Sequence, residues 1–187
     1  MNVYIWGPPT WRLLHTIARN PPHPADVDAF ITVLGHLLPC SYCRASYGPF
    51  VTNLGAPSAA MQANELPLWM YNLHNLVNAK LGKTACTPTL EHVRIRFAMQ
   101  PRAWSNEDIF DMIALFGMNY QAENRVHYET WWGLLPKMVR MHDADLARQL
   151  ESVPTPTSAT DFVATAIVMG GAQPEHKYRA YCMAKVY

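Results

Sequence analysis

Apolar residues recur at helical spacing through the first hundred positions of the chain. The clearest case is residues 26–38, where one helical face would carry Val27, Phe30, Ile31, Leu34, Leu37 and Leu38. Spacings of three and four residues place side chains on one side of an α-helix. This segment is therefore predicted to be a helix that packs one face against a core.

Three further helices are predicted in the same half of the chain. The first is capped by Thr10 and ends before a run of prolines. Its apolar face would consist of Trp11, Leu14, His15 and Ala18. A short helix is expected to start at about Cys40 and to end at Gly48-Pro49, because proline has no N–H group for the helix. The last covers residues 65–81, and Gly82 suits the position that follows a helix end.

The second half of the chain is also expected to be mostly helical. Ser105 fits the N-cap of a helix with an acidic first turn. Further helices are predicted over residues 125–135, 144–150 and 160–169, with Pro136 bending or ending the first of them. No strand pattern is longer than a few residues, so the predicted fold class is all-α. A first domain over residues 1–90 and a second over residues 91–187 are expected.

Composition and charge narrow the function. Half of the 187 residues are apolar and 16% are charged, so a core is expected and disorder is not. The net charge of +1 argues against a nucleic-acid binder that follows the phosphate backbone. The N-terminus lacks the pattern of a targeting peptide, and the apolar stretch over residues 162–169 is too short to span a bilayer. The expectation is a soluble cytosolic protein without a membrane span.

Cys40 and Cys43 form a CxxC pair. At a helix start these two sulfurs can form a disulfide, and the free N–H groups there favour the thiolate that exchanges with another thiol. Disulfides in the cytosol are usually catalytic or redox-sensing, so the pair is interpreted as a redox centre.

Three alternatives to this interpretation remain at this point. A thioredoxin-like pair would need a βαβ fold around the CxxC, which the helical pattern disfavours. A zinc site would need further ligands, and the candidates Cys86, Cys182, His74 and His92 are poorly spaced. The third alternative is a CxxC pair with a purely structural role.

A redox pair must pass its electrons on, and the aromatic, histidine, asparagine and lysine residues on both sides of the CxxC could form the walls of a flavin site. No GxGxxG motif follows a strand, so a flavin would have to bind inside a helical bundle. Candidates for its flat walls, its hydrogen-bond partners and its phosphate-binding cations are Trp11, His15, Trp69, His74, Asn75, Asn78, Lys80 and Lys83. Taken singly, the aromatic residues and histidines also fit an ordinary core, and the lysines fit a solvated surface.

Three segments together resemble a known family. They are WGPPTWRLLH at residues 6–15, PCSYC at residues 39–43 and WMYNLHNLVNAKLGK at residues 69–83. In this order and spacing they resemble the Erv/ALR family of FAD-linked sulfhydryl oxidases over about residues 4–84. The resemblance implies a bundle of four main helices and a short fifth that holds FAD noncovalently. A helical C-terminal extension follows it here.

The resemblance also implies residue roles. Cys43 would face the flavin, and Cys40 would exchange with a thiol of a protein substrate. Reduced FAD would pass its electrons to O₂ and give H₂O₂. The implied FAD-pocket residues are Gly7, Trp11, His15, Tyr47, Trp69, His74, Asn75, Asn78, Lys80 and Lys83. Family members are commonly homodimers, so a homodimer is expected. A metal site is not expected.

The chain departs from the family pattern in its other cysteines. Tyr71 stands where many cellular members have one cysteine of a structural disulfide, which leaves Cys86 without its usual partner. No second CxxC is present to serve as a shuttle, so Cys86 and Cys182 are expected to be free thiols and substrates to reach Cys40 directly.

The missing shuttle and the extension resemble family members of large DNA viruses. The similar segments cover residues 106–120 and 132–136. This second resemblance implies that the protein is located in the host cytosol, at a virus assembly site or in the virion. Substrate surface, dimer contact and partner-docking face remain open as roles for the extension. The alternative functions are a helical binding module without redox activity and a flavoprotein that passes electrons to a cytochrome.

Overall fold

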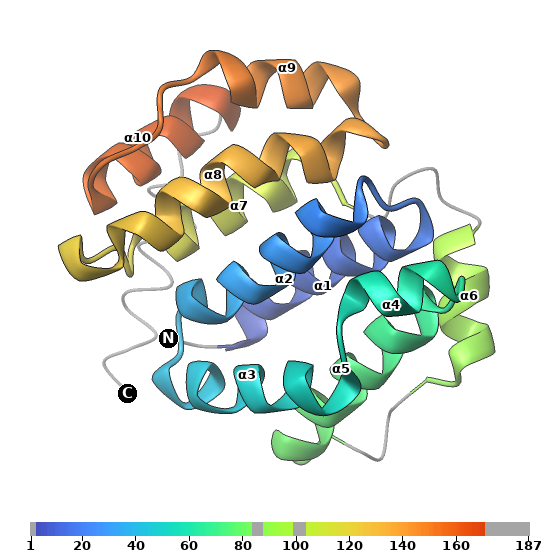
Figure 1. The fold of residues 1–187 in the computed structure, drawn as a ribbon. Helices are drawn as coiled ribbons and strands as arrows, with labels where there is room; N and C mark the ends of the chain where they lie inside the picture. Colours follow the sequence, from blue (N-terminus) through green and yellow to red (C-terminus); the bar gives the residue numbers. More distant parts are fainter. Residues whose placement is uncertain (1–2, 84–87, 99–103, 171–187) are drawn as a thin grey trace.

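Two helices, α1 (Val3–Arg19) and α2 (Pro24–Leu37), lie in the middle of the molecule (Figure 1). The structure, a computed structural model, describes residues 3–83, 88–98 and 104–170. On one side of the central helices lie α3 (Ser41–Leu54), α4 (Pro57–Gln62), α5 (Leu66–Lys80) and α6 (Leu90–Ala98). On the other lie α7 (Asn106–Gly117), the short 3-10 helix η2 (Ala122–Asn124), α8 (Arg125–Arg140), α9 (Ala144–Ser152) and α10 (Ala159–Gly170). The described residues form helices and connections without a strand, which confirms the all-α prediction.

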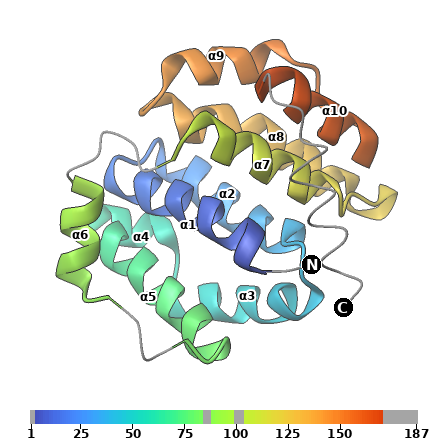
Figure 2. The ribbon, with the colours of Figure 1, turned by 180° about the vertical axis from the view of Figure 1, so that it is seen from behind.

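The two central helices connect the two sides. α1 packs on α5 and α6 on one side and on α7 on the other, while α2 packs on α3, α4 and α8. The same arrangement is seen from behind in Figure 2. One hydrophobic cluster runs through both parts, from Trp6 to Ala166. Among the described residues, no helix has both the length and the apolar character needed to cross a membrane.

Several predicted elements are confirmed. All six residues of the predicted apolar face in residues 26–38 are buried. α5 covers the predicted fourth helix, and Gly82 follows it with a φ of 70°. Ser105 caps α7 as expected, because its hydroxyl accepts from the Asp108 amide at 3.2 Å and the Asp108 carboxylate accepts from the Ser105 amide at 2.8 Å.

Two predicted helix boundaries, the start at Thr10 and the end at Gly48-Pro49, are wrong. α1 begins at Val3 and contains Pro8 and Pro9, so Thr10 is an interior residue whose hydroxyl donates to the Trp6 carbonyl at 2.7 Å. α3 continues through Gly48-Pro49. α8 also continues through Pro136, which therefore does not end that helix. An interior proline costs about 3 kcal/mol in an isolated helix, and packing of an apolar face against a core offsets a cost of that size.

Two short helices, α4 and α6, were not predicted. α6 starts after Thr89, whose hydroxyl accepts from the His92 amide at 3.2 Å and so caps the first turn. Most of its side chains are exposed, so the segment lacks the apolar stripe from which longer helices are recognised. It lies across the predicted boundary near residue 90 and packs on α1 and α5.

Candidate active site

The Cys40–Cys43 disulfide lies at the start of α3. The two sulfurs are bonded, and the Cα atoms are 5.1 Å apart. Cys40 is the N-cap residue, and its Sγ accepts from the Cys43 amide at 3.2 Å. Arg44 stabilises the chain that leads into this turn, because its guanidinium donates to the Leu38 carbonyl. Both cysteines are half-buried, and the unpaired N–H groups of a helix start stabilise a thiolate formed there.

A narrow cavity opens beside Cys43, between α1, α2, α3 and α5. Its volume is about 40 Å³, and Leu14, Leu34, Leu38 and Val77 make most of it apolar. Two polar atoms in its wall, Trp6 Nε1 and the Tyr47 hydroxyl, are buried and have no hydrogen-bond partner among the described residues. A buried donor without a partner costs about 1–3 kcal/mol, so this wall is suited to a ligand that supplies hydrogen-bond acceptors.

A second cavity of about 510 Å³ continues from the first along α1 and α5. Val3, Trp11 and Leu81 line both cavities, so the two adjoin each other, and Cys43 lines the first. We refer to the two adjoining cavities together as the α1–α5 groove. Trp11 stacks on His74 with ring centroids 3.9 Å apart and planes 9° apart. The groove thus offers a narrow apolar end beside the disulfide and a wider end with a flat aromatic wall.

His15 and His74, two of the three histidines that line the wide end, are neutral near pH 7. Burial, followed by the charges of His74 and Arg96, lowers the pKa of His15 to about 3. Burial, followed by the charge of Lys83, lowers the pKa of His74 to about 4. His15 Nε2 and His74 Nδ1 lie 2.9 Å apart and share one hydrogen. Since neither ring carries a charge, the positive groups that remain in this part of the lining are Arg12, Lys83 and Arg96.

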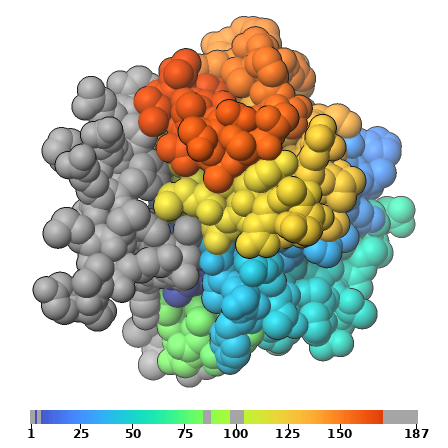
Figure 3. All heavy atoms as spheres, turned by 90° about the vertical axis from the view of Figure 1, so that its left-hand side faces the viewer, coloured from blue at the N-terminus to red at the C-terminus, as the bar shows by residue number. Residues whose placement is uncertain are grey.

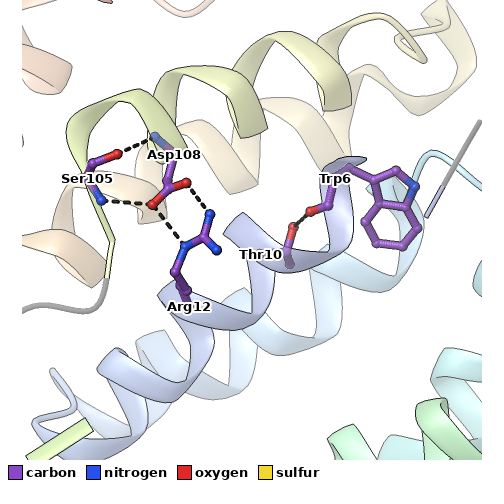
Figure 4. A network of polar contacts seen from close by, with 5 residues as sticks. All are labelled: Trp6, Thr10, Arg12, Ser105 and Asp108. Atoms are coloured by element: carbon purple, nitrogen blue, oxygen red, sulfur yellow. Dashed lines mark hydrogen bonds and ion pairs between the residues drawn. The ribbon is translucent and has the colours of Figure 1, made fainter. Parts of the chain in front are cut away.

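Arg12 also links the groove to the second half of the chain (Figure 4). Its guanidinium makes a two-pronged ion pair with the Asp108 carboxylate, with Arg12 Nε donating to Oδ2 at 3.0 Å and Nη2 donating to Oδ1. Asp108 also completes the cap with Ser105, as Figure 4 shows. The first turn of α7 is thereby tied to the helix that forms one wall of the groove.

Comparison with known proteins agrees with this geometry. Residues 8–98 match the model of the Erv1/Alr family. This segment is an Erv1/Alr domain. It contains the disulfide, the α1–α5 groove except for Val3, Trp6 and Gly7, and all of α6. The family resemblance of the three sequence segments is confirmed.

Several individual relatives are named as FAD-linked sulfhydryl oxidases. The mitochondrial FAD-linked sulfhydryl oxidase ERV1 of Saccharomyces cerevisiae is 32% identical over 83 residues, which are 41% of this chain and 43% of that protein. FAD-linked sulfhydryl oxidase ERV1 of Arabidopsis thaliana is 31% identical over 83 residues, 41% of this chain and 42% of its own. Protein 096R of Invertebrate iridescent virus 3, whose name assigns it this activity provisionally, is 27% identical over 114 residues, 57% of this chain and 77% of its own. The chain thus spans less than half the length of the yeast and plant relatives. No solved structure gave a match.

Most of the predicted site residues of the Erv1/Alr domain meet in the groove. Six of them line its wide end, namely Gly7, Trp11, His15, His74, Asn78 and Lys83. Tyr47 and Lys80 line the narrow end together with Cys43. The Lys80 side chain points to the start of α3 and not to the cations of the wide end. Its ammonium donates to the Tyr42 carbonyl and the Ser46 hydroxyl, and lies 3.4 Å from the centre of the Tyr42 ring.

Two predicted site residues line neither part of the groove. Trp69 is buried in the core, and its indole N–H donates to the Gly55 carbonyl at 3.0 Å. Asn75 is half-buried on α5. Their place in an FAD site stays a prediction.

Several lining residues were not predicted from the sequence. His92, Val93 and Arg96 come from α6, and Arg12 comes from the middle of the first motif. A signal for α6 was present, since His92 and Arg96 are spaced as neighbours on a helix that Thr89 can cap. No comparable signal singles out Arg12.

The described residues give only part of the information on the other two cysteines and on the alternative of a zinc site. Cys86 and Cys182 lie outside the described residues, so their states stay predictions. Tyr71 donates its hydroxyl to the Pro88 carbonyl at 3.0 Å, which ties α5 to the chain leading into α6. No group of three or more His, Cys, Asp or Glu side chains within the described residues could hold a metal ion.

Proposed function

We propose that this chain is an FAD-dependent sulfhydryl oxidase that forms disulfide bonds in thiol-containing proteins, with O₂ as electron acceptor. The observation that carries the proposal is the position of the Cys40–Cys43 disulfide at the mouth of the α1–α5 groove. The names of the relatives of its Erv1/Alr domain support the same activity.

The groove residues fit FAD. When bound, FAD would supply the step that passes two electrons from the reduced cysteine pair to O₂. The unpartnered Trp6 Nε1 and Tyr47 hydroxyl suit the carbonyl and nitrogen acceptors of a flavin ring. Trp11 and the neutral His15 and His74 suit a second planar ring, and the cations of the wide end suit a diphosphate. Trp69 and Asn75 are proposed to support the site from behind this lining.

The narrow end must widen to admit a ring system. A volume of about 40 Å³ holds little more than one water molecule. Lys80 and Tyr42 form its outer rim, and the side chain of Tyr42 is 63% exposed. We assign the widening to these two side chains, because Tyr42 is the exposed residue of this lining and the Lys80 ammonium lies against its ring.

The cysteines divide the chemistry between them. A substrate thiolate attacks Cys40 Sγ, the Cys40–Cys43 bond breaks, and Cys43 leaves as a thiolate that the start of α3 stabilises. A second substrate thiolate then attacks the mixed disulfide, releasing Cys40 as a thiolate and the substrate as a disulfide. The cysteine pair has gained two electrons, which leave on its Cys43 side. Reduction of O₂ to H₂O₂ takes up these two electrons and two protons.

The wider context is proposed from the same resemblance. The catalytic part would cover about residues 1–90 together with α6, and the rest of residues 91–187 would form the extension. A homodimer in the cytoplasm is the proposed state, at a virus assembly site or in the virion if the chain is viral. Direct exchange between substrates and Cys40 is proposed, without a shuttle through Cys86 or Cys182.

A stoichiometric oxidation assay tests the activity. Purified protein loaded with FAD is given dithiothreitol, and O₂ uptake, H₂O₂ and remaining thiols are measured. The proposal expects one O₂ consumed and one H₂O₂ formed per two thiols, and no turnover by Cys40→Ser or Cys43→Ser. O₂ uptake that persists in both variants would refute the role of the pair. Thiol loss that requires added cytochrome c rather than O₂ would favour the cytochrome-linked alternative.

A further inference from the structure

A third cavity lies on α3 away from the α1–α5 groove and has a volume of about 530 Å³. α2, α3 and Asn124, the last residue of η2, line it. We refer to it as the α2–α3 cleft. Figure 3 views the side of the molecule where the yellow start of α8 borders the blue and cyan residues of α2 and α3.

Cys43 and Cys40 are followed along α3 by two neighbouring rows of side chains. Cys43 lines the α1–α5 groove. Cys40, Arg44 and Gly48 follow one another at intervals of four residues, which places them along one stripe of the helix. From Arg44 onward this stripe lines the cleft. The disulfide therefore joins the stripe that enters the cleft to the wall of the groove.

We propose that the α2–α3 cleft binds an extended segment of the protein substrate, so that the substrate cysteine reaches Cys40. This inference rests on the proposed oxidase function. The stripe from Arg44 to Thr52 is about 12 Å long at 1.5 Å per helical residue, which matches about four residues of extended chain. The cleft thus has the length to hold the residues that flank a cysteine.

The lining suits a polypeptide backbone. Gly35, Ala45 and Gly48 leave the floor without long side chains, and Thr32, Thr52 and Asn124 supply hydroxyl and amide groups that can pair with main-chain N–H and C=O groups. Arg44 is the permanently charged residue in the lining, and no carboxylate lines the cleft. The chemistry therefore favours a segment with neutral or acidic side chains beside its cysteine.

Tyr47 separates the cleft from the groove. Its ring lines both cavities and is 5% exposed. A Cβ atom at Gly35 would lie 2.7 Å from the Tyr47 ring, so the glycine makes room for this partition. A substrate thiol in the cleft is thereby kept out of the groove, and the disulfide is the path for its electrons.

The cleft also gives the extension a role in substrate binding. Asn124 forms part of the wall, and His36 stacks on His127 of α8 with ring centroids 3.9 Å apart and planes 4° apart. A small dithiol needs none of these contacts, whereas a protein segment would use both walls.

The test compares a protein with a small dithiol. Gly48→Leu places a side chain in the cleft, and a Cβ at Gly48 meets nothing within 4 Å. Gly133→Leu is the matched control, because Gly133 is an exposed helical glycine of α8 with the same open surroundings. Asn124→Trp obstructs the opposite wall, where Asn124 makes no side-chain cap bond. The measured quantity is kcat/KM on reduced, unfolded ribonuclease A divided by kcat/KM on dithiothreitol.

The proposal expects this ratio to fall by about tenfold or more in Gly48→Leu and Asn124→Trp, as for loss of a main binding contact, and to stay near the wild-type value in Gly133→Leu. A general structural defect would lower both rates and leave the ratio unchanged. If the wild type is active and the ratio is unchanged in both cleft variants, the substrate-binding role of the cleft is refuted and the oxidase function is not. A wild type that oxidises neither substrate would refute the oxidase and the cleft with it.

Discussion

Replacement of Asp108 is expected to loosen the contact between α7 and α1. The Arg12 and Asp108 side chains are 33% and 16% exposed, and the carboxylate accepts both guanidinium bonds as well as the Ser105 amide (Figure 4). Hydrogen bonds to charged groups contribute about 1.5–3 kcal/mol. Asp108→Asn keeps an acceptor for the cap but places an amide donor against the guanidinium. Discounted for the partial exposure of Arg12, the expected loss of stability is about 1–2 kcal/mol.

Asp108→Ala also removes the capping bond, which adds about 1 kcal/mol and gives about 2–3 kcal/mol in total. Asp26→Asn is the matched control. It breaks another ion pair between the two sides, from Lys137 of α8 to Asp26 of α2 at 2.8 Å, with side chains 49% and 26% exposed. Such a pair contributes at most about 1 kcal/mol.

Urea unfolding followed by tryptophan fluorescence measures all three variants. The order of stability should be wild type, Asp26→Asn, Asp108→Asn and Asp108→Ala, from highest to lowest. A double-mutant cycle with Arg12→Ala should assign most of the Asp108→Asn loss to the pair. If Asp108→Asn unfolds at the same urea concentration as Asp26→Asn, the pair does not hold the halves together.

Two further predictions concern the groove. Because burial holds the pKa of His15 near 3 and of His74 near 4, the unfolded chain takes up protons below about pH 6.5 while the folded chain does not. Stability should therefore fall by about 1.5 kcal/mol per histidine between pH 6.5 and 5, and His74→Gln should reduce this drop, measured by urea unfolding. Equal stability at both pH values would contradict the burial of the two rings. Gly35→Ala should destabilise the protein by about 1–3 kcal/mol and weaken FAD binding measured by flavin fluorescence, since its Cβ would lie 2.7 Å from the Tyr47 ring. Gly133→Ala, with open space around it, should not destabilise, and equal effects of the two would refute the packing role of Gly35.

Helical periodicity and capping patterns predicted the larger part of the fold. The apolar face of residues 26–38, the cap at Ser105 and the turn at Gly82 depend on neighbours within one or two turns, and all three are confirmed. The proline positions depend on more than local chemistry. Pro49 and Pro136 each remove an N–H from a helix, yet both helices continue. Contacts with distant helices decide such cases, and a local pattern does not contain them.

The candidate site was predictable to a similar extent. The CxxC pair and six residues that line the wide end were found from three short segments. Lys80 was expected at the phosphates but bonds to the start of α3, since its direction depends on how α5 crosses that helix. The Arg12–Asp108 pair spans 96 positions of the chain. Contacts at such a separation arise only when the two halves pack together.

The visible absorption spectrum of the purified protein shows directly whether a flavin is bound and whether the cysteine pair reduces it. We expect a bound-flavin spectrum that bleaches when dithiothreitol is added and recovers as dissolved oxygen is consumed. We also expect Cys43→Ser to bind FAD but not to bleach at the wild-type rate. A colourless protein that takes up no added FAD would refute the FAD-dependent oxidase and would favour a helical binding module.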